Sequence, residues 1–208
     1  MHHGHDTQAH WQQVYQTKAP DSVSWHQPTA ARSLTLLREG GLGPQSALID
    51  VGGGASRLVD ALLDEPVGSI TVMDLSEAAL GLARQRLGER AREVTWLVGD
   101  ITKVSLPAQA YDLWHDRAVF HFMTTPESRQ AYLQRLQHAL RPGGHVVMST
   151  FAEDGPERCS GLPVQRYSRQ ELMHALGPRF VLLAHERELH TTPSGAQQAF
   201  NHALLRFA

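Results

Sequence analysis

The chain has 208 residues, of which 41% are hydrophobic and 19% charged, and its formal net charge is −2. This size and composition are typical of one globular domain, residues 1–208, with a sizeable apolar core, and the near-neutral charge argues against a nucleic-acid partner bound through its phosphates. The single cysteine, Cys159, excludes an intramolecular disulfide framework and an all-cysteine zinc site. No apolar run has the length of a membrane helix and no signal-peptide pattern is present, so we expect no membrane partner and a cytoplasmic location. We interpret the four histidines between positions 2 and 10 as a tail, and predict no metal site.

Residues 1–28 form an aromatic leading segment. Trp11, Val14 and Tyr15 lie at helical spacing within residues 8–15, and Trp25 follows a turn. Two interpretations stay open: the segment packs on the sheet, or it folds over a ligand cleft as a lid, with Tyr15 and Trp25 touching the substrate. Residues 29–39 are predicted to be helical, and the core of the domain is expected to span residues 46–208.

A strand over residues 47–51 runs into three consecutive glycines, Gly52, Gly53 and Gly54, and a helix follows from Ser56. Glycine has no Cβ and tolerates positive φ, so a ligand can approach bare backbone at such a turn. A second strand, over residues 69–73, ends at Asp74, whose carboxylate can accept hydrogen bonds from ribose hydroxyls. Together these features predict a site for a nucleoside cofactor.

The remaining chain alternates between strand and helix patterns. Helix starts are predicted at Ser76, at Thr125 followed by proline, and at the capping box that opens at Ser168. Strands are predicted over residues 94–98, 111–114, 145–150, 180–189 and 199–207, with a long loop over 152–167. Such alternation favours an α/β fold: a doubly wound three-layer sandwich with a mostly parallel seven-stranded sheet and a terminal antiparallel element.

The dinucleotide fingerprint G-x-G-x-x-G fails because Arg57 stands where the third glycine is needed, and no phosphate-loop motif is present. The chain instead resembles the class I S-adenosylmethionine-dependent methyltransferases. The resemblance rests on four motifs in order: Asp50-Val51-Gly52-Gly53-Gly54, Asp74-Leu75, Gly99-Asp100-Ile101, and Leu140-Arg141-Pro142-Gly143-Gly144 before the fifth strand. It implies S-adenosylmethionine as cofactor, with the glycine turn at its amino-acid end, Asp74 on the ribose, and Leu75 and Asp100 at the adenine.

The resemblance also places the methyl transfer near the end of the fourth strand, at His115 and Asp116. His115 is expected to act as a general base or to orient the acceptor, and a packing histidine is the alternative. Asp116 is a second catalytic candidate, although the sequence slightly favours a structural ion pair of Asp116 with Arg117 at a helix start.

Four further residues are candidates for acceptor binding: His121, Arg166, Tyr167 and His190. The alternatives are a core position for His121 and a loop-bracing role for Arg166. Cys159 lies in a loop that looks exposed, and we assign it no role.

We therefore expect a methyltransferase that acts on a small molecule by in-line displacement, which needs orientation more than acid–base chemistry. A protein side chain such as lysine is the alternative acceptor, because the aromatic leading segment is faintly similar to that of protein-lysine methyltransferases. A non-catalytic S-adenosylmethionine-binding protein is a second alternative. The oligomeric state stays open.

Overall fold

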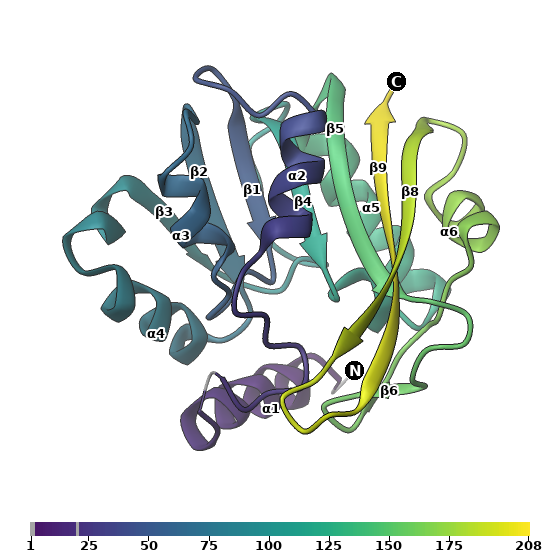
Figure 1. The fold of residues 1–208 in the computed structure, drawn as a ribbon. Helices are drawn as coiled ribbons and strands as arrows, with labels where there is room; N and C mark the ends of the chain where they lie inside the picture. Colours follow the sequence, from purple (N-terminus) through teal and green to yellow (C-terminus); the bar gives the residue numbers. More distant parts are fainter. Residues whose placement is uncertain (1–2, 20) are drawn as a thin grey trace.

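A seven-stranded sheet organises the molecule, which we describe from a computed structural model covering residues 3–19 and 21–208 (Figure 1). The strand order is β3-β2-β1-β4-β5-β9-β8; β9 runs antiparallel to both of its neighbours, and the other neighbouring strands are parallel. This topology confirms the predicted fold class. The strands are β1 Ala47–Val51, β2 Ser69–Asp74, β3 Val94–Val98, β4 Tyr111–Arg117, β5 Leu140–Phe151, β8 Phe180–Thr191 and β9 Gln197–Phe207.

Helices cover both faces of the sheet, because successive side chains of a strand point to opposite faces. In β4, Leu113 packs in one core with α2 (Ala31–Glu39) and α3 (Leu58–Leu63), and Trp114 packs in the other core with α5 (Pro126–Ala139) and α6 (Arg169–Leu176). The first core also holds α4 (Glu77–Leu87), which continues as the 3₁₀ helix η1 (Gly88–Glu93). The two side-chain sets of each strand therefore have different environments.

The predicted helix starts are confirmed. The Ser76 hydroxyl accepts a hydrogen bond from the backbone N–H of Ala79, which caps α4. Thr125 caps α5 with proline at its first position, and Ser168 and Glu171 form a reciprocal capping box on α6. Each of these caps sets the residue at which its helix begins.

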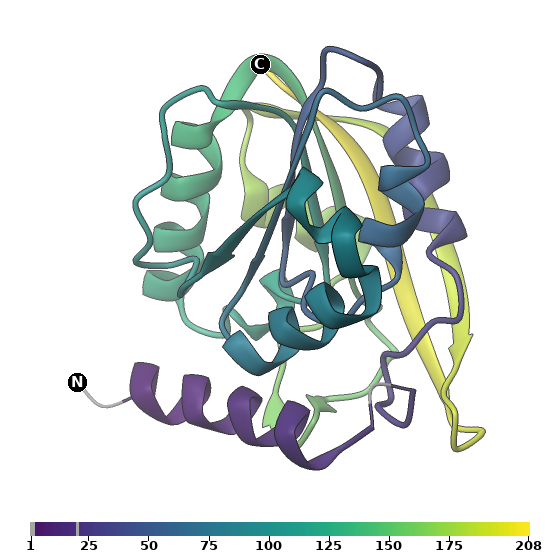
Figure 2. The same ribbon diagram turned by 90° about the vertical axis from the view of Figure 1, so that its left-hand side faces the viewer.

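Helix α1 (His3–Thr17) crosses the edge of the sheet formed by the carboxyl ends of the parallel strands (Figure 2). It extends beyond the predicted residues 8–15; residues 1, 2 and 20 of the leading segment lie outside the described part. The Gln12 side-chain oxygen accepts hydrogen bonds from the Ser76 hydroxyl (3.0 Å) and the Ala78 N–H (3.1 Å). Trp11 meets Trp25 of the same segment edge-on, and it meets Phe122, which follows β4, in the same way; the ring centroids are 5.4 Å apart in each pair. Helix α1 is thus attached to the domain at both polar and aromatic contacts.

The end of β4 and the segment before α6 differ from the prediction. Strand β4 continues through Arg117, so His115 and Asp116 belong to the strand rather than to the turn after it. The segment predicted as a loop contains a short antiparallel pair, β6 (Arg158–Cys159) and β7 (Leu162–Pro163). The expected exposure of Cys159 is wrong: this pair folds the thiol inward against Phe151 and Phe200, where it is 3% exposed.

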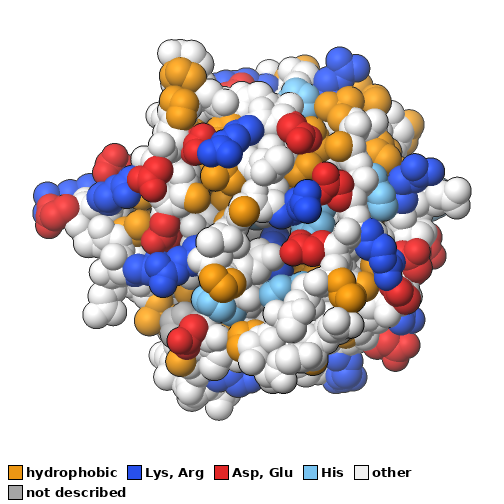
Figure 3. Space-filling model, in the orientation of Figure 1, with side chains coloured by type: hydrophobic (Ala, Val, Ile, Leu, Met, Phe, Trp, Pro, Cys, Tyr) orange, Lys and Arg blue, Asp and Glu red, His pale blue; other side chains and the backbone are white. Residues whose placement is uncertain are grey.

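Within the described residues, no helix combines the length and the apolar character required to cross a membrane. On the face shown in Figure 3, basic and acidic side chains are interspersed and form no extended area of one sign.

Candidate active site

The three glycines after β1 are required by close approach. Gly52 and Gly54 have φ of +72° and +44°, in the left-handed region. A Cβ on Gly53 would lie 2.5 Å from Asp50 Oδ2 and 2.6 Å from Val72 Cγ1, and a Cβ on Gly54 would lie 2.8 Å from Asp74 Oδ2. The turn therefore passes directly over two buried carboxylates.

A cavity of about 60 Å³ adjoins this turn. Tyr15 and Trp25 of the leading segment line it, and the Trp25 indole N–H donates a hydrogen bond to the Tyr15 hydroxyl (3.2 Å). Burial and the nearby charge of Asp74 raise the pKa of Tyr15 well above its usual value. The wall also contains Val23, His26, Gln27, Ala30, Asp50, Gly52, Gly53, Ala55, Ser56, Arg57, His115 and Arg117.

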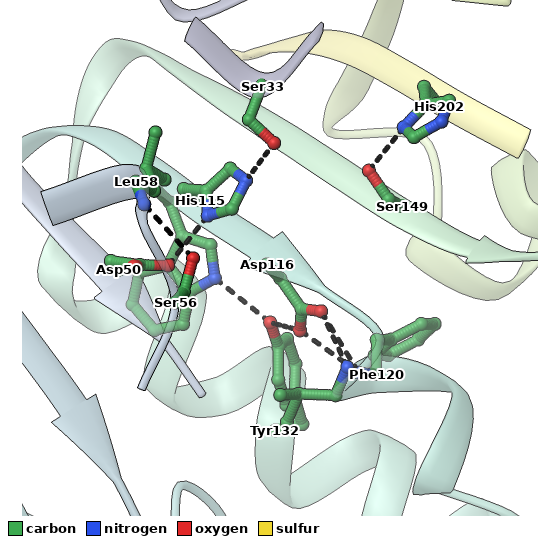
Figure 4. Close-up of polar contacts among 12 residues, drawn as sticks. Ser33, Asp50, Ser56, Leu58, His115, Asp116, Phe120, Tyr132, Ser149 and His202 are labelled. Atoms are coloured by element: carbon green, nitrogen blue, oxygen red, sulfur yellow. Dashed lines mark hydrogen bonds and ion pairs between the residues drawn. The ribbon is translucent and has the colours of Figure 1, made fainter. Parts of the chain in front are cut away.

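Asp50, His115 and Ser33 form a buried chain of hydrogen bonds (Figure 4). Asp50 Oδ1 lies 2.6 Å from His115 Nδ1, and His115 Nε2 lies 2.8 Å from Ser33 Oγ on α2. Each of the three residues is no more than 3% exposed. The His115 ring is thereby held between the two oxygens, and its contact at Nδ1 orients the Asp50 carboxyl group. Both nitrogens of the predicted base are therefore engaged within the protein.

Asp74 lies at the end of β2, as predicted, and its Oδ1 accepts a hydrogen bond from the Ser76 N–H at 2.8 Å. Burial, reinforced by the charge of Asp50, raises its pKa to about 7, although hydrogen bonds from backbone N–H groups oppose this rise. Its oxygens face the glycine turn through the close approach to Gly54. A paired acceptor at this point suits the two hydroxyls of a ribose.

The adjacent strand ends carry the remaining cofactor candidates. The Gly99 N–H donates to the Asp74 carbonyl (3.0 Å), which ties the loop after β3 to the end of β2. Asp100 accepts hydrogen bonds from the backbone N–H and the hydroxyl of Thr102, whereas Ile101 is buried in the core. The adenine contacts proposed for Asp100 and for Leu75, which follows Asp74, stay predictions.

Asp116 lies on the opposite face of the sheet from His115 (Figure 4). The Tyr132 hydroxyl donates to it at 2.5 Å, and the backbone N–H groups of Val119 and Phe120 donate as well. Burial raises the pKa of Asp116 to about 6 against these hydrogen bonds. It is fully buried and does not line the cavity, so it anchors the turn after β4. The alternative prediction, a structural ion pair between Asp116 and Arg117, is wrong, because the side chains of adjacent strand residues point to opposite faces of the sheet.

The four other acceptor candidates do not come together at the cavity. His121 is fully buried against Phe151, with ring centroids 4.7 Å apart, and Tyr167 stacks on Phe120 in the α5–α6 core. Arg166 donates to the Gly155 carbonyl and pairs with Glu157, which corresponds to the loop-bracing interpretation. His190 Nε2 lies 2.9 Å from the Ser24 carbonyl oxygen, where it holds the leading segment.

Sequence reasoning missed two polar residues at this site. Ser33 lies on α2, where its partner comes from a distant strand and leaves no local signal. Arg117 lines the cavity two positions after His115, and strand alternation from His115 would have found it. Among the described residues, no group of three or more His, Cys, Asp or Glu side chains is arranged to hold a metal ion.

Comparison with known proteins identifies relatives among methyltransferases. A family model described as "Methyltransferase domain" matches residues 48–144. An uncharacterised chloroplast methyltransferase of Arabidopsis thaliana is 37% identical over 90 residues, which cover 43% of this chain and 23% of that protein. A ubiquinone/menaquinone biosynthesis C-methyltransferase of Cupriavidus taiwanensis is 25% identical over 119 residues, which cover 56% of this chain and 48% of that protein. The chain thus spans less than half the length of these curated relatives.

A solved structure shows the same fold over the whole chain. The Burkholderia thailandensis 1,6-didemethyltoxoflavin-N1-methyltransferase, with bound 1,6-didemethyltoxoflavin and S-adenosylhomocysteine, superposes with a TM-score of 0.71 at 20% identity. The superposition covers 100% of this chain and 92% of that one.

The residues at the glycine turn fit S-adenosylmethionine. Asp50 Oδ2 is buried with no hydrogen-bond partner in the described part of the chain. This oxygen is therefore available to interact with a cationic group of a ligand. The glycine turn leaves its backbone uncovered at positions where a Cβ would collide with Asp50 or Asp74. Beside it, the Asp74 carboxylate can accept hydrogen bonds from the ribose hydroxyls. Together, the fold, the site and the matched family identify the chain as carrying a class I S-adenosylmethionine-dependent methyltransferase domain.

Proposed function

We propose that this domain methylates a small molecule, with S-adenosylmethionine as donor. The observation that carries the proposal is the position of the cavity: it lies between the glycine turn and the end of β4, beneath Tyr15 and Trp25. A covered cavity suits a free small molecule better than a side chain on a large protein surface. The Burkholderia structure, which holds a small acceptor and S-adenosylhomocysteine, also supports this choice.

In this proposal, the residues of the chain bind the donor and the acceptor and orient them toward each other. The backbone of Gly52–Gly54 and the carboxylates of Asp50 and Asp74 would hold the donor, and His115 fixes the direction of the Asp50 carboxylate through their 2.6 Å hydrogen bond. S-adenosylmethionine supplies an activated methyl group on a sulfonium. The task of the protein is to align the acceptor with that group, and such alignment accounts for much of the rate enhancement in displacement reactions.

We further infer that the leading segment is a lid. The cavity of about 60 Å³ is smaller than the roughly 300–1,000 Å³ typical of ligand sites, so ligands require the cover to move. The segment is attached by few polar contacts, those of Gln12 and the Ser24 carbonyl among them. Limited proteolysis between α1 and α2 should slow when S-adenosylhomocysteine is bound, and equal cleavage rates with and without it would argue against a lid.

One labelling experiment separates the candidate functions. The purified protein is incubated with S-adenosylmethionine carrying a labelled methyl group and with a cell extract divided into small-molecule and protein fractions. Label transferred to the small-molecule fraction supports the proposal, and label in protein points to a side-chain acceptor. Calorimetric binding of S-adenosylmethionine without transfer to either fraction would favour a non-catalytic binding protein.

The role of His115 is tested by a matched pair of variants. His115→Ala should change S-adenosylhomocysteine binding by less than about tenfold, or 1.4 kcal/mol, but reduce turnover by more than that. Ser33→Ala keeps the bond between Asp50 and His115 and should have the smaller effect on turnover. Full activity in His115→Ala would remove this residue from the catalytic machinery.

A further inference from the structure

Arg117 is a buried cation whose hydrogen-bonding capacity is only partly used. Its Nη1 donates to the Trp25 carbonyl oxygen at 3.0 Å, and its Cζ lies 4.8 Å from the centroid of the Phe200 ring. Its Nε and Nη2 are buried and have no partner, and in residues 3–19 and 21–208 no carboxylate lies within 4.0 Å of it in an ion pair. Buried polar groups are nearly always hydrogen-bonded, so these donors indicate a missing ligand.

The charge of Arg117 is not neutralised nearby. The nearest acidic influence is Glu188, whose carboxylate is already bonded to His202 Nε2 at 2.7 Å. Burial lowers the pKa of Arg117 to about 10, which leaves it charged at neutral pH. Burial, together with the charge of Arg117, lowers the pKa of His121 to about 3, so this neighbour is neutral. Arg117 is therefore a buried cation that forms no ion pair among the described residues.

The two unused donors have a particular geometry. In a guanidinium, Nε and Nη2 lie along one edge, and their two N–H groups are parallel. This edge matches the two oxygens of a carboxylate, which it binds through two hydrogen bonds at once. Phe200 packs its ring against the guanidinium. The aromatic residues Tyr15 and Trp25 line the cavity itself, which suits a planar molecule.

The position of Arg117 in the sheet favours the acceptor over the donor. The donor residues Asp50 and Asp74 belong to β1 and β2, on one side of β4. Phe200, which covers the guanidinium, belongs to β9 on the other side of β4, and Trp25 approaches from the leading segment. Arg117 itself lines the cavity at the end of β4, where a second ligand would lie beside the donor.

We propose that Arg117 binds a carboxylate of the methyl acceptor, and that the acceptor class is a planar small molecule with one such group. This inference rests on the proposed function, because it assigns the second ligand of the same cavity. The α-carboxylate of the donor is the other carboxylate that can reach this region, and the experiment below distinguishes the two.

The test measures binding of small aromatic carboxylates, with benzoate as the first probe, to the protein loaded with S-adenosylhomocysteine. Each carboxylate is compared at millimolar concentration with its neutral primary amide, such as benzamide, by ligand-observed NMR and calorimetry. We expect carboxylates to bind at least tenfold more tightly than their amides. Arg117→Met should abolish this difference, leave the S-adenosylhomocysteine affinity unchanged, and keep or raise the melting temperature, because it removes an unpaired buried charge.

Arg166→Met is the matched control, since Arg166 already has partners in the Gly155 carbonyl and Glu157; it should retain the preference for carboxylates. Equal binding of acids and amides, no binding of any carboxylate tested, or a preference that survives in Arg117→Met would overturn the proposal. A tenfold loss of S-adenosylhomocysteine affinity in Arg117→Met would also overturn it, by assigning Arg117 to the donor. Failure of the wild-type protein to bind S-adenosylhomocysteine would instead refute the proposed function.

Discussion

The charge state of Asp74 should set the pH dependence of donor binding. Burial and the charge of Asp50 raise its pKa to about 7, so the carboxyl is about 10% ionised at pH 6 and about 90% at pH 8. The ionised form is the stronger acceptor for ribose hydroxyls. S-adenosylhomocysteine should therefore bind about tenfold more tightly at pH 8 than at pH 6, a difference of about 1.4 kcal/mol.

The same pKa shift of Asp74 predicts how the stability of the ligand-free protein changes with pH. The pKa of Asp74 in the folded state lies above its ordinary value of 3.8, so the folded chain holds this proton where the unfolded chain has lost it. The contribution of Asp74 to the free energy of unfolding should thus fall as the pH rises from about 4 to about 7. Ligand binding, which favours the ionised form, should release a proton.

Isothermal titration calorimetry at the two pH values, in buffers with different ionisation enthalpies, measures both the affinity and the proton release. Asp74→Asn keeps the shape but cannot ionise, so its affinity should not change with pH. This variant retains Asp116, whose pKa is about 6, so any pH dependence that comes from Asp116 rather than from Asp74 would persist in it. Equal wild-type affinities at both pH values, or the same pH dependence in Asp74→Asn, would refute the assignment.

Two further substitutions test the packing of the site. Gly53→Val places a Cβ 2.5 Å from Asp50 Oδ2, and it should cost about 1–3 kcal/mol of unfolding free energy and abolish donor binding. The control Gly81→Ala has open space at its Cβ, and in urea denaturation it should be neutral or stabilising by up to about 1 kcal/mol. Tyr132→Phe removes a donor to Asp116 and should cost about 1–3 kcal/mol at pH 8 but less at pH 5, where Asp116 is protonated. A cost that does not change with pH would contradict the pKa of about 6 assigned to that carboxyl.

The fold could be predicted because its signals are local. Strand alternation, the caps at Ser76, Thr125 and Ser168, and the glycine turn each depend on neighbouring residues, and all of them point to one architecture. The position of Asp74 followed from the same logic, since the carboxyl ends of parallel strands share one edge of the sheet.

The contacts within the site were harder to predict, because they join distant elements. His115 and Asp116 are adjacent in the chain, so one motif predicts both as catalytic, but strand β4 directs their side chains to opposite faces of the sheet. One joins Asp50 and Ser33, and the other anchors a turn. Cys159 was misjudged because a two-residue strand pair, too short to recognise in the sequence, folds the thiol inward.

The charges of the site also suggest why donor and acceptor occupy one cavity. On the β1 side, Asp50 Oδ2 is buried and has no partner in the described part of the chain, so a cationic ligand would stabilise it. At the end of β4, the free edge of Arg117 would be stabilised by an anionic ligand. A sulfonium donor and a carboxylate acceptor together satisfy both sides, whereas either ligand alone leaves one buried charge unpaired. Because an unpaired buried charge is costly, we expect each ligand to strengthen the binding of the other.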